Sequence, residues 1–274
     1  KPYKLNKLNK PHLNPRSGTT YAFSKAVEYL KQGIGLSKRL YKKALGKSPY
    51  IHSYETLERY VGVFNHFKDT VLIPDRVNTI NKITPIHINT HFNNLLKQKC
   101  SEKTISINAS ALMKLFEALN RQDLMDYIEQ KRPGWRKSAL PSAKTEPFLY
   151  PEKVIQAIPY PYKACAIIQY LTGARVSDIR KVYEWLIKNP DTSVIMIRKS
   201  KGGRDRILNY YDRLSSLTYV KNAVEKIRRH FKSDDIDWLK FMKEYTEEVK
   251  AAARKCNETY CGTHAFRVNY ANDR

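Results

Sequence analysis

Apolar residues recur at intervals of three and four through the first half of the chain, the spacing of the buried face of an amphipathic helix. This pattern predicts helices over residues 20–33, 53–68, 84–95 and 101–116. The last three begin at Ser53, Thr84 and Ser101, whose side chains can cap free backbone N–H groups. We therefore expect residues 1–130 to form an all-helical domain, in which residues 1–50 are a basic extension with an extra helix.

The periodic pattern stops after residue 130. The stretch Lys131–Phe148 contains three prolines, one glycine and five basic residues, and its apolar residues show no regular spacing. Proline and glycine interrupt regular structure, and they are common in connections between domains. Residues 131–146 are therefore predicted to be a positively charged linker.

Regular patterns resume beyond the linker and predict a second domain over residues 147–274. Helical spacing recurs in segments 150–158, 160–171, 217–231 and 234–255. Apolar residues alternate over 194–197, Gly202-Gly203 supplies a turn, and Ile207-Leu208 resumes the pattern, which predicts a β-hairpin. The expected fold class is mainly α with a small antiparallel β-sheet (α+β).

The charge balance favours a polyanionic partner. Fifty Lys and Arg residues against 26 Asp and Glu residues give a formal net charge of +24 over 274 residues. Nucleic acid is the commonest partner of so basic a surface, although general lysine enrichment would give the same balance. No apolar stretch is long enough to predict a membrane span. We expect a cytoplasmic protein that is associated with the nucleoid or with DNA.

The cysteines and histidines do not predict a metal site. Four cysteines in a chain of this size form no disulfide framework, which favours a reducing compartment. Cys256, Cys261 and His264 lie close in sequence, but their spacing is not that of a zinc site and no second pair follows. His87 and His91 share one helix face without a third ligand, so we expect both at the surface.

The segment LTGARVSDIR, residues 171–180, carries the first candidate site. Gly173 stands where an apolar helix must end, and Ser177 can cap the next helix, with Asp178 in its first turn. Arg175 is then held between two helix ends, where its guanidinium can bind two phosphate oxygens. Taken alone, the same pattern also fits ordinary capping beside a solvated arginine.

Two further segments carry candidate chemistry. In the hairpin, Lys199 and Lys201 precede a turn that also carries Arg204 and Arg206, and a lysine there can deliver a proton to a leaving oxygen. Near the end of the sequence, HAFR places His264 and Arg267 three residues apart on one helix face while Phe266 points elsewhere. Each signal is weak by itself.

The order of these segments resembles the tyrosine recombinase (phage integrase) family. An arginine in TGARVSD, a lysine on a hairpin and then HAFR after two helices follow that family's pattern from about Glu146 to Arg274. Residues 1–130 also look like the family's helical core-binding domain. One departure is Val268, where many relatives have histidine.

The resemblance implies DNA cleavage by a tyrosine hydroxyl through a 3′-phosphotyrosine intermediate, without a metal or another cofactor. Arg175 and Arg267 match the arginines that stabilise the transition state, and His264 matches the residue that assists proton transfer. Lys201 best matches the general acid, with Lys199 as the alternative, and Asp178 matches a supporting acidic residue.

The implied partners are double-stranded DNA and further copies of the chain, as a homodimer or homotetramer on DNA, in recombination, integration or transposition of a mobile element. We expect the two domains to clamp the duplex, with the linker crossing it. The basic residues expected to contact DNA are Lys131, Arg132, Arg136, Lys137, Arg204 and Arg206.

Relatives place the nucleophilic tyrosine several helical turns after the second arginine, so we expect it beyond Arg274. Tyr270 lies one turn from Arg267 and is interpreted as a core or helix-face residue. Because the first residue is Lys and not Met, we expect the natural protein to be longer. Two alternatives stay open. A type IB topoisomerase shares the chemistry but usually carries lysine in place of His264, and a DNA-binding protein of this fold could lack catalysis.

Overall fold

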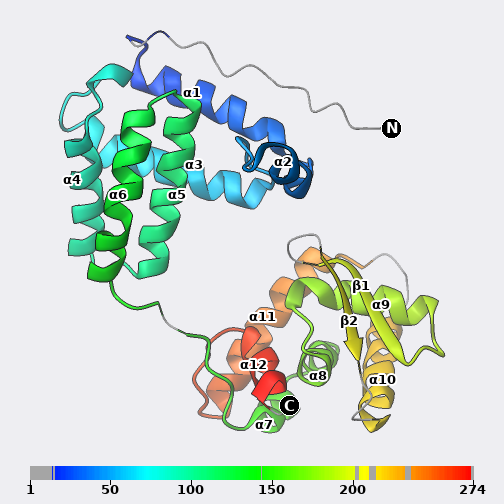
Figure 1. The fold of residues 1–274 in the computed structure, drawn as a ribbon. Coiled ribbons are helices and arrows are strands. Elements are labelled where there is room, and N and C mark those ends of the chain that lie inside the picture. Colours follow the sequence, from blue (N-terminus) through cyan, green and yellow to red (C-terminus); the bar gives the residue numbers. More distant parts are fainter. Residues whose placement is uncertain are drawn as a thin grey trace. The chain divides into compact units, whose positions relative to one another are not determined.

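The structure is a computed structural model that describes residues 14, 16–142, 144–200, 204–209, 214–231 and 236–272. Side chains at positions 199, 204, 209 and 214–216 are not part of that description. The chain divides into two compact units, Lys1–Ala143 and Lys144–Arg274. The described residues are mainly helical with one two-stranded antiparallel sheet, which confirms the expected mainly-α composition (Figure 1).

The first unit is all-helical within its described part. Helices α4, α5 and α6 lie side by side, and α1 and α3 pack against α5 (Figure 1). Its core includes Phe64, Phe67, Phe92 and Phe116, each fully buried. The elements are α1 (Thr19–Leu30), a 3₁₀ turn (Lys31–Gly33), α2 (Lys38–Leu45), α3 (Tyr54–Phe67), a π-helical turn (Lys68–Leu72), a 3₁₀ turn (Ile80–Lys82), α4 (Pro85–Lys97), α5 (Glu102–Ala118) and α6 (Gln122–Ser138).

Three helix starts match their predicted caps. Ser53 and Ser101 each accept a hydrogen bond from the backbone N–H three residues later, and Thr84 forms a capping box with His87. The surface prediction for the two histidines is wrong. His87 is half-buried because its Nδ1 accepts the Thr84 backbone N–H at 2.9 Å. His91 is fully buried, with its Nε2 3.0 Å from Oδ1 of Asn108.

The predicted linker starts too early, because α6 continues through Ser138 with Pro133 inside it. The ring of Trp135 stacks on Phe92 with centroids 4.0 Å apart, and Trp135 is buried. A buried aromatic side chain contributes about 2 to 3 kcal/mol, comparable to the cost of proline in a helix interior. Tertiary packing therefore outweighs the local signal, and the connection to the second unit, which starts at Lys144, begins only after Ser138.

The second unit surrounds helix α8, which packs against α7, α10, α11 and α12. The first residues of this unit are fixed to α12, because the backbone of Phe148 exchanges hydrogen bonds of 3.0 and 2.7 Å with the Asn269 side chain. The elements are α7 (Pro151–Ala157), α8 (Tyr162–Thr172), a 3₁₀ turn (Val176–Asp178), α9 (Ile179–Lys188), β1 (Val194–Ser200), β2 (Arg204–Asn209), α10 (Leu214–Phe231), α11 (Trp238–Lys255) and α12 (His264–Asn272).

The predicted hairpin is present as β1 and β2, with the Gly202-Gly203 turn outside the described residues. Ile197 pairs with Arg206, and the register shifts between Ile197 and Ser200. Strict alternation would turn Ser200 away from the face on which Ile195 and Ile197 are buried. Ser200 is nevertheless buried, because the irregularity re-aims its side chain. The hairpin thus directs a hydroxyl group toward the interior.

Among the helices that the structure describes, none is both long enough and apolar enough to cross a bilayer.

Candidate functional site

The turn between α8 and α9 is built around Gly173. This glycine ends α8 in the left-handed conformation, at φ +62°, which confirms the predicted C-cap. A Cβ atom at this position would lie 2.4 Å from the Tyr270 ring, so the site excludes a side chain. Tyr270 is half-buried against the turn, in agreement with its interpretation as a helix-face residue.

A buried polar network fixes the path of this turn. The Thr172 hydroxyl accepts the backbone N–H of Ala174 at 3.0 Å, and the Gln169 amide donates to the Ala174 carbonyl at 3.1 Å. The other end of Gln169 accepts a 2.6 Å hydrogen bond from the Tyr245 hydroxyl. Because each of these side chains is buried, the network holds the turn firmly against α8 and α11.

The predicted cap at Ser177 is wrong. Residues Val176–Asp178 form a 3₁₀ turn, Ser177 is exposed, and no side chain caps the start of α9. Asp178 is the residue that turns inward, with 1 % of its surface exposed. The Asp178 carboxylate can be buried because it has cationic and hydroxyl partners in the interior, whereas Ser177 stays at the surface.

Three cationic side chains surround the Asp178 carboxylate. The nearest nitrogens of Arg175, Arg206 and Lys181 lie 3.7, 3.7 and 3.9 Å from its oxygens. Ser200 bridges two members of the group: its hydroxyl donates to Asp178 at 2.9 Å and accepts from Arg175 at 2.9 Å. Asp178 therefore holds Arg175 both directly and through Ser200.

Arg267 joins this group from α12. Its Nη1 donates a 2.5 Å hydrogen bond to the carbonyl of Gly173, in the same turn that carries Arg175. Burial lowers the pKa of Arg267, and the positive charges of Arg206 and Arg175 lower it further. The two predicted arginines, 92 positions apart in sequence, are thus electrostatic neighbours. We call Arg175, Asp178, Lys181, Arg206 and Arg267 the Asp178 cluster.

The Asp178 cluster has a surplus of positive charge, because four cationic side chains share one carboxylate. One buried donor of Arg206, its Nη1, has no hydrogen-bond partner among the described atoms. A buried donor without an acceptor costs about 1 to 3 kcal/mol. The nearest acceptor to this atom is the Asp178 carboxylate at 3.7 Å, and an anion bound beside the cluster would neutralise the surplus charge.

The remaining predicted residues of the second unit have different placements. His264 is exposed at the first position of α12, one turn before Arg267. Lys201 lies outside the described residues, as do the side chains of Lys199 and Arg204. Arg206, predicted at a DNA-binding surface, instead points toward Asp178, because its pairing with Ile197 places it on the inner face of the hairpin.

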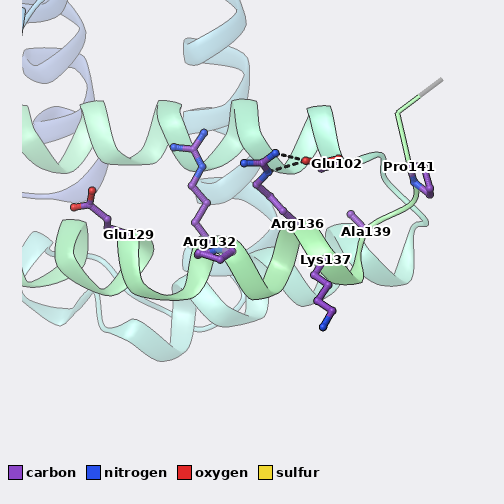
Figure 2. A pocket seen from close by; sticks show the side chains of 8 residues that line it. Glu102, Glu129, Arg132, Arg136, Lys137, Ala139 and Pro141 are labelled. Carbon is purple, nitrogen blue, oxygen red and sulfur yellow. Dashed lines mark hydrogen bonds and ion pairs between the residues drawn. The ribbon is translucent and has the colours of Figure 1, made fainter. Parts of the chain in front are cut away.

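The basic residues predicted in the linker lie on helix α6. Arg132 donates to the Ser106 carbonyl at 3.3 Å and the Ser110 hydroxyl at 3.2 Å, and Arg136 forms an ion pair with Glu102. Figure 2 shows both arginines directed toward α5, while Lys137 points away. With Lys137, they line a pocket of about 500 Å³. Lys131 lies over the ring of Tyr127, 6.0 Å from its centroid.

Sequence reasoning missed two members of the site, Ser200 and Lys181. Lys181 follows Asp178 by three residues on a helix, a spacing from which the pair could have been found. Ser200 gives no such signal, because its inward direction depends on the irregular register of the hairpin.

A scan against protein-family models matches none, and a search of curated proteins finds no match.

Proposed function

We propose that this protein is a DNA strand transferase of the tyrosine recombinase type, which cuts and rejoins DNA through a 3′-phosphotyrosine intermediate. The observation that carries the proposal is the meeting of Arg175 and Arg267 at one turn, beside the buried Asp178 carboxylate. Two arginines that are held in place at one turn are better pre-organised to bind the oxygens of a phosphodiester than arginines on a solvated surface.

The chemistry requires stabilisation of a pentacoordinate phosphorus whose non-bridging oxygens gain negative charge. Arg175 and Arg267 supply guanidinium donors for those oxygens. Both are partly buried, which strengthens their interaction with the developing charge relative to water. Asp178 and Ser200 hold Arg175 in place, so little reorganisation is needed as the charge forms.

Proton transfers complete the proposed reaction. The attacking tyrosine hydroxyl loses its proton as its oxygen bonds to phosphorus, and the 5′-oxygen leaves with a proton. In the proposal His264 assists at the phosphate, Lys201 donates to the leaving oxygen with Lys199 as the alternative, and the nucleophile lies beyond Arg274. Since the phosphotyrosine conserves the energy of the broken bond, rejoining needs no ATP.

The helical first unit is proposed to bind the same duplex, in line with the chain's net charge of +24. Strand exchange between two duplexes requires more than one active site. We therefore infer a homodimer or homotetramer on DNA.

The proposal is tested with the full-length protein and a nicked suicide substrate, in which the cut strand loses the fragment needed for rejoining. We expect a covalent protein–DNA adduct whose bond is a phosphotyrosine. Absence of an adduct would rule out both enzymatic interpretations and leave a non-catalytic DNA-binding protein. Given an adduct, strand exchange between paired sites supports a recombinase, whereas relaxation of supercoiled DNA without exchange supports a type IB topoisomerase.

A further inference from the structure

A second cationic site lies in the first unit, in a pocket of about 370 Å³ between α2, α3, α5 and α6. Five cationic side chains and one carboxylate line it, together with the Ser48 and Ser110 hydroxyls. Its cationic residues are Lys38, Lys42, Lys47, Lys114 and Arg132. The site lies wholly within one unit, and its assignment does not depend on the proposed strand transfer.

The single carboxylate is already occupied by two of the lysines. Glu117 accepts a hydrogen bond from Lys114 at 2.6 Å and lies 3.4 Å from Lys47. Lys114 is also anchored to the Ser48 carbonyl at 2.5 Å. Lys38 and Lys42 form no ion pair within the described part of the chain. Positive charge therefore remains uncompensated in the pocket.

Helix α2 concentrates positive charge beside the pocket. Four of its eight residues are basic, and none is acidic. Lys38 and Lys42 stand four positions apart, where like charges repel by a few tenths of a kcal/mol. Lys38 also lies in the first turn, where positive charge opposes the helix dipole, whereas Lys42 and Lys43 lie in the last turn, where the dipole favours positive charge. Such a conflict between local sequence and structure is typical of a binding site.

Apolar and aromatic side chains also line the pocket. Tyr60 and Met113 are half-buried there, and Met125 is buried. Thioether and aromatic groups form a soft, polarisable surface against which a flat ring can pack. The cationic side chains and the apolar side chains together fit a ligand that carries both phosphate and a ring.

We propose that this pocket binds a small phosphate-bearing ligand of the nucleotide class, with its phosphates on Lys38, Lys42 and Arg132 and its ring against Tyr60 and the two methionines. The volume lies within the range of small-molecule sites. The stacked bases of a DNA duplex cannot enter such a pocket, so a duplex would offer it phosphate alone.

Titration calorimetry of the full chain tests the proposal, with ATP, adenosine and inorganic phosphate as separate probes at near-physiological salt. We expect ATP to bind with one-to-one stoichiometry, and adenosine and phosphate each to bind at least about tenfold more weakly. Lys42→Gln should weaken ATP binding by about tenfold, through loss of one charge-assisted hydrogen bond. Lys43→Gln, a neighbour on α2 that does not line the pocket, is the matched control and should change little.

A second variant leaves the charge unchanged. Met113→Trp should fill the apolar side of the pocket and abolish ATP binding, with circular dichroism showing that the fold is retained. Equal losses for Lys42→Gln and Lys43→Gln would show diffuse attraction and overturn the proposal. Three other results would also overturn the proposal. They are phosphate binding as tight as ATP binding, the absence of ATP binding, and an effect of Lys42→Gln on the binding of duplex DNA but not of ATP.

Discussion

The Ser200 hydroxyl donates a 2.9 Å hydrogen bond to the buried carboxylate of Asp178. The same hydroxyl accepts a hydrogen bond from Arg175, so it links the carboxylate to the guanidinium. Ser200 and Asp178 are only 3 % and 1 % exposed, so solvent water has little access to replace this hydrogen bond. The relationship joins the hairpin to the α8–α9 turn and makes Ser200 a positioning residue for Arg175.

Replacing this hydroxyl should slow DNA cleavage without weakening DNA binding. In the full-length protein we expect Ser200→Ala to lower the cleavage rate by about 10- to 100-fold, because a small misplacement of Arg175 costs transition-state stabilisation. The measurements are single-turnover cleavage and duplex affinity. Ser200→Thr keeps a hydroxyl and should recover much of the rate. Equal rates for wild type and Ser200→Ala would refute the positioning role.

Removing either arginine should have a larger effect on the rate. We expect Arg175→Ala and Arg267→Ala to leave duplex affinity largely intact and to reduce cleavage by about 10² to 10³-fold. Arg180 is a matched control, because it is an exposed arginine close to the same turn whose guanidinium pairs with Glu184 at 2.6 Å. Normal cleavage by Arg175→Ala, or an equal loss in Arg180→Ala, would contradict the assignment.

Duplex binding should depend steeply on salt, because phosphate contacts release counterions. We expect the logarithm of affinity to fall by about one unit per log unit of salt for each phosphate neutralised. Filter binding over a salt series with the full-length protein measures the slope. A slope near zero would contradict binding dominated by contacts between DNA phosphates and this chain of net charge +24.

The local features of the fold could be predicted from the sequence, and the long-range ones could not. Ser53 and Ser101 cap the helices that follow because capping depends on residues three positions apart. Helix α6 runs through Pro133, and the buried Trp135 that follows stacks on Phe92, a long-range contact that no local sequence pattern predicts.

The candidate site divides in the same way. Gly173 was predictable as a C-cap from the apolar helix before it. Arg206 was expected at the surface, and its pairing with Ile197 instead turned it toward Asp178. A shift of one position in strand register reverses which face a side chain occupies, and an isolated sequence does not define that register.

Acid should destabilise the first unit through His91. Burial, with a smaller contribution from the nearby His66, lowers the pKa of His91 from 6.5 to about 4, and the hydrogen bond that its Nε2 makes to the Asn108 side-chain oxygen opposes this shift only in part. Between these two pKa values the unfolded chain binds a proton at His91 and the folded chain does not. The contribution of His91 to the free energy of unfolding is therefore complete above pH 6.5 and is lost as the pH falls toward 4. We expect this group to remove about 2 kcal/mol of unfolding free energy between about pH 7 and about pH 5.

Urea unfolding at both pH values measures that loss. His91→Gln removes the titrating ring while keeping a polar group near Asn108, so its stability should change less across the same interval. Glutamic and aspartic acids titrate in both proteins, and the difference between them isolates His91. An identical pH dependence in the two proteins would show that His91 does not control the acid response.

Of the two glycines that the structure describes in the second unit, Gly173 should tolerate a side chain less well. Both Gly173 and Gly262 adopt positive φ, at +62° and +88°, but only Gly173 faces a close neighbour, the Tyr270 ring. Gly262→Ala should cost about 1 kcal/mol from backbone strain alone. Gly173→Ala should cost about 2 to 4 kcal/mol, because the ring must also move. Chemical unfolding compares the two variants, and equal losses of unfolding free energy would show that the Tyr270 ring moves aside at no cost.

Gly173→Ala should also lower DNA cleavage by the full-length protein, because Arg267 donates a hydrogen bond to the Gly173 carbonyl, and Gly262→Ala should not.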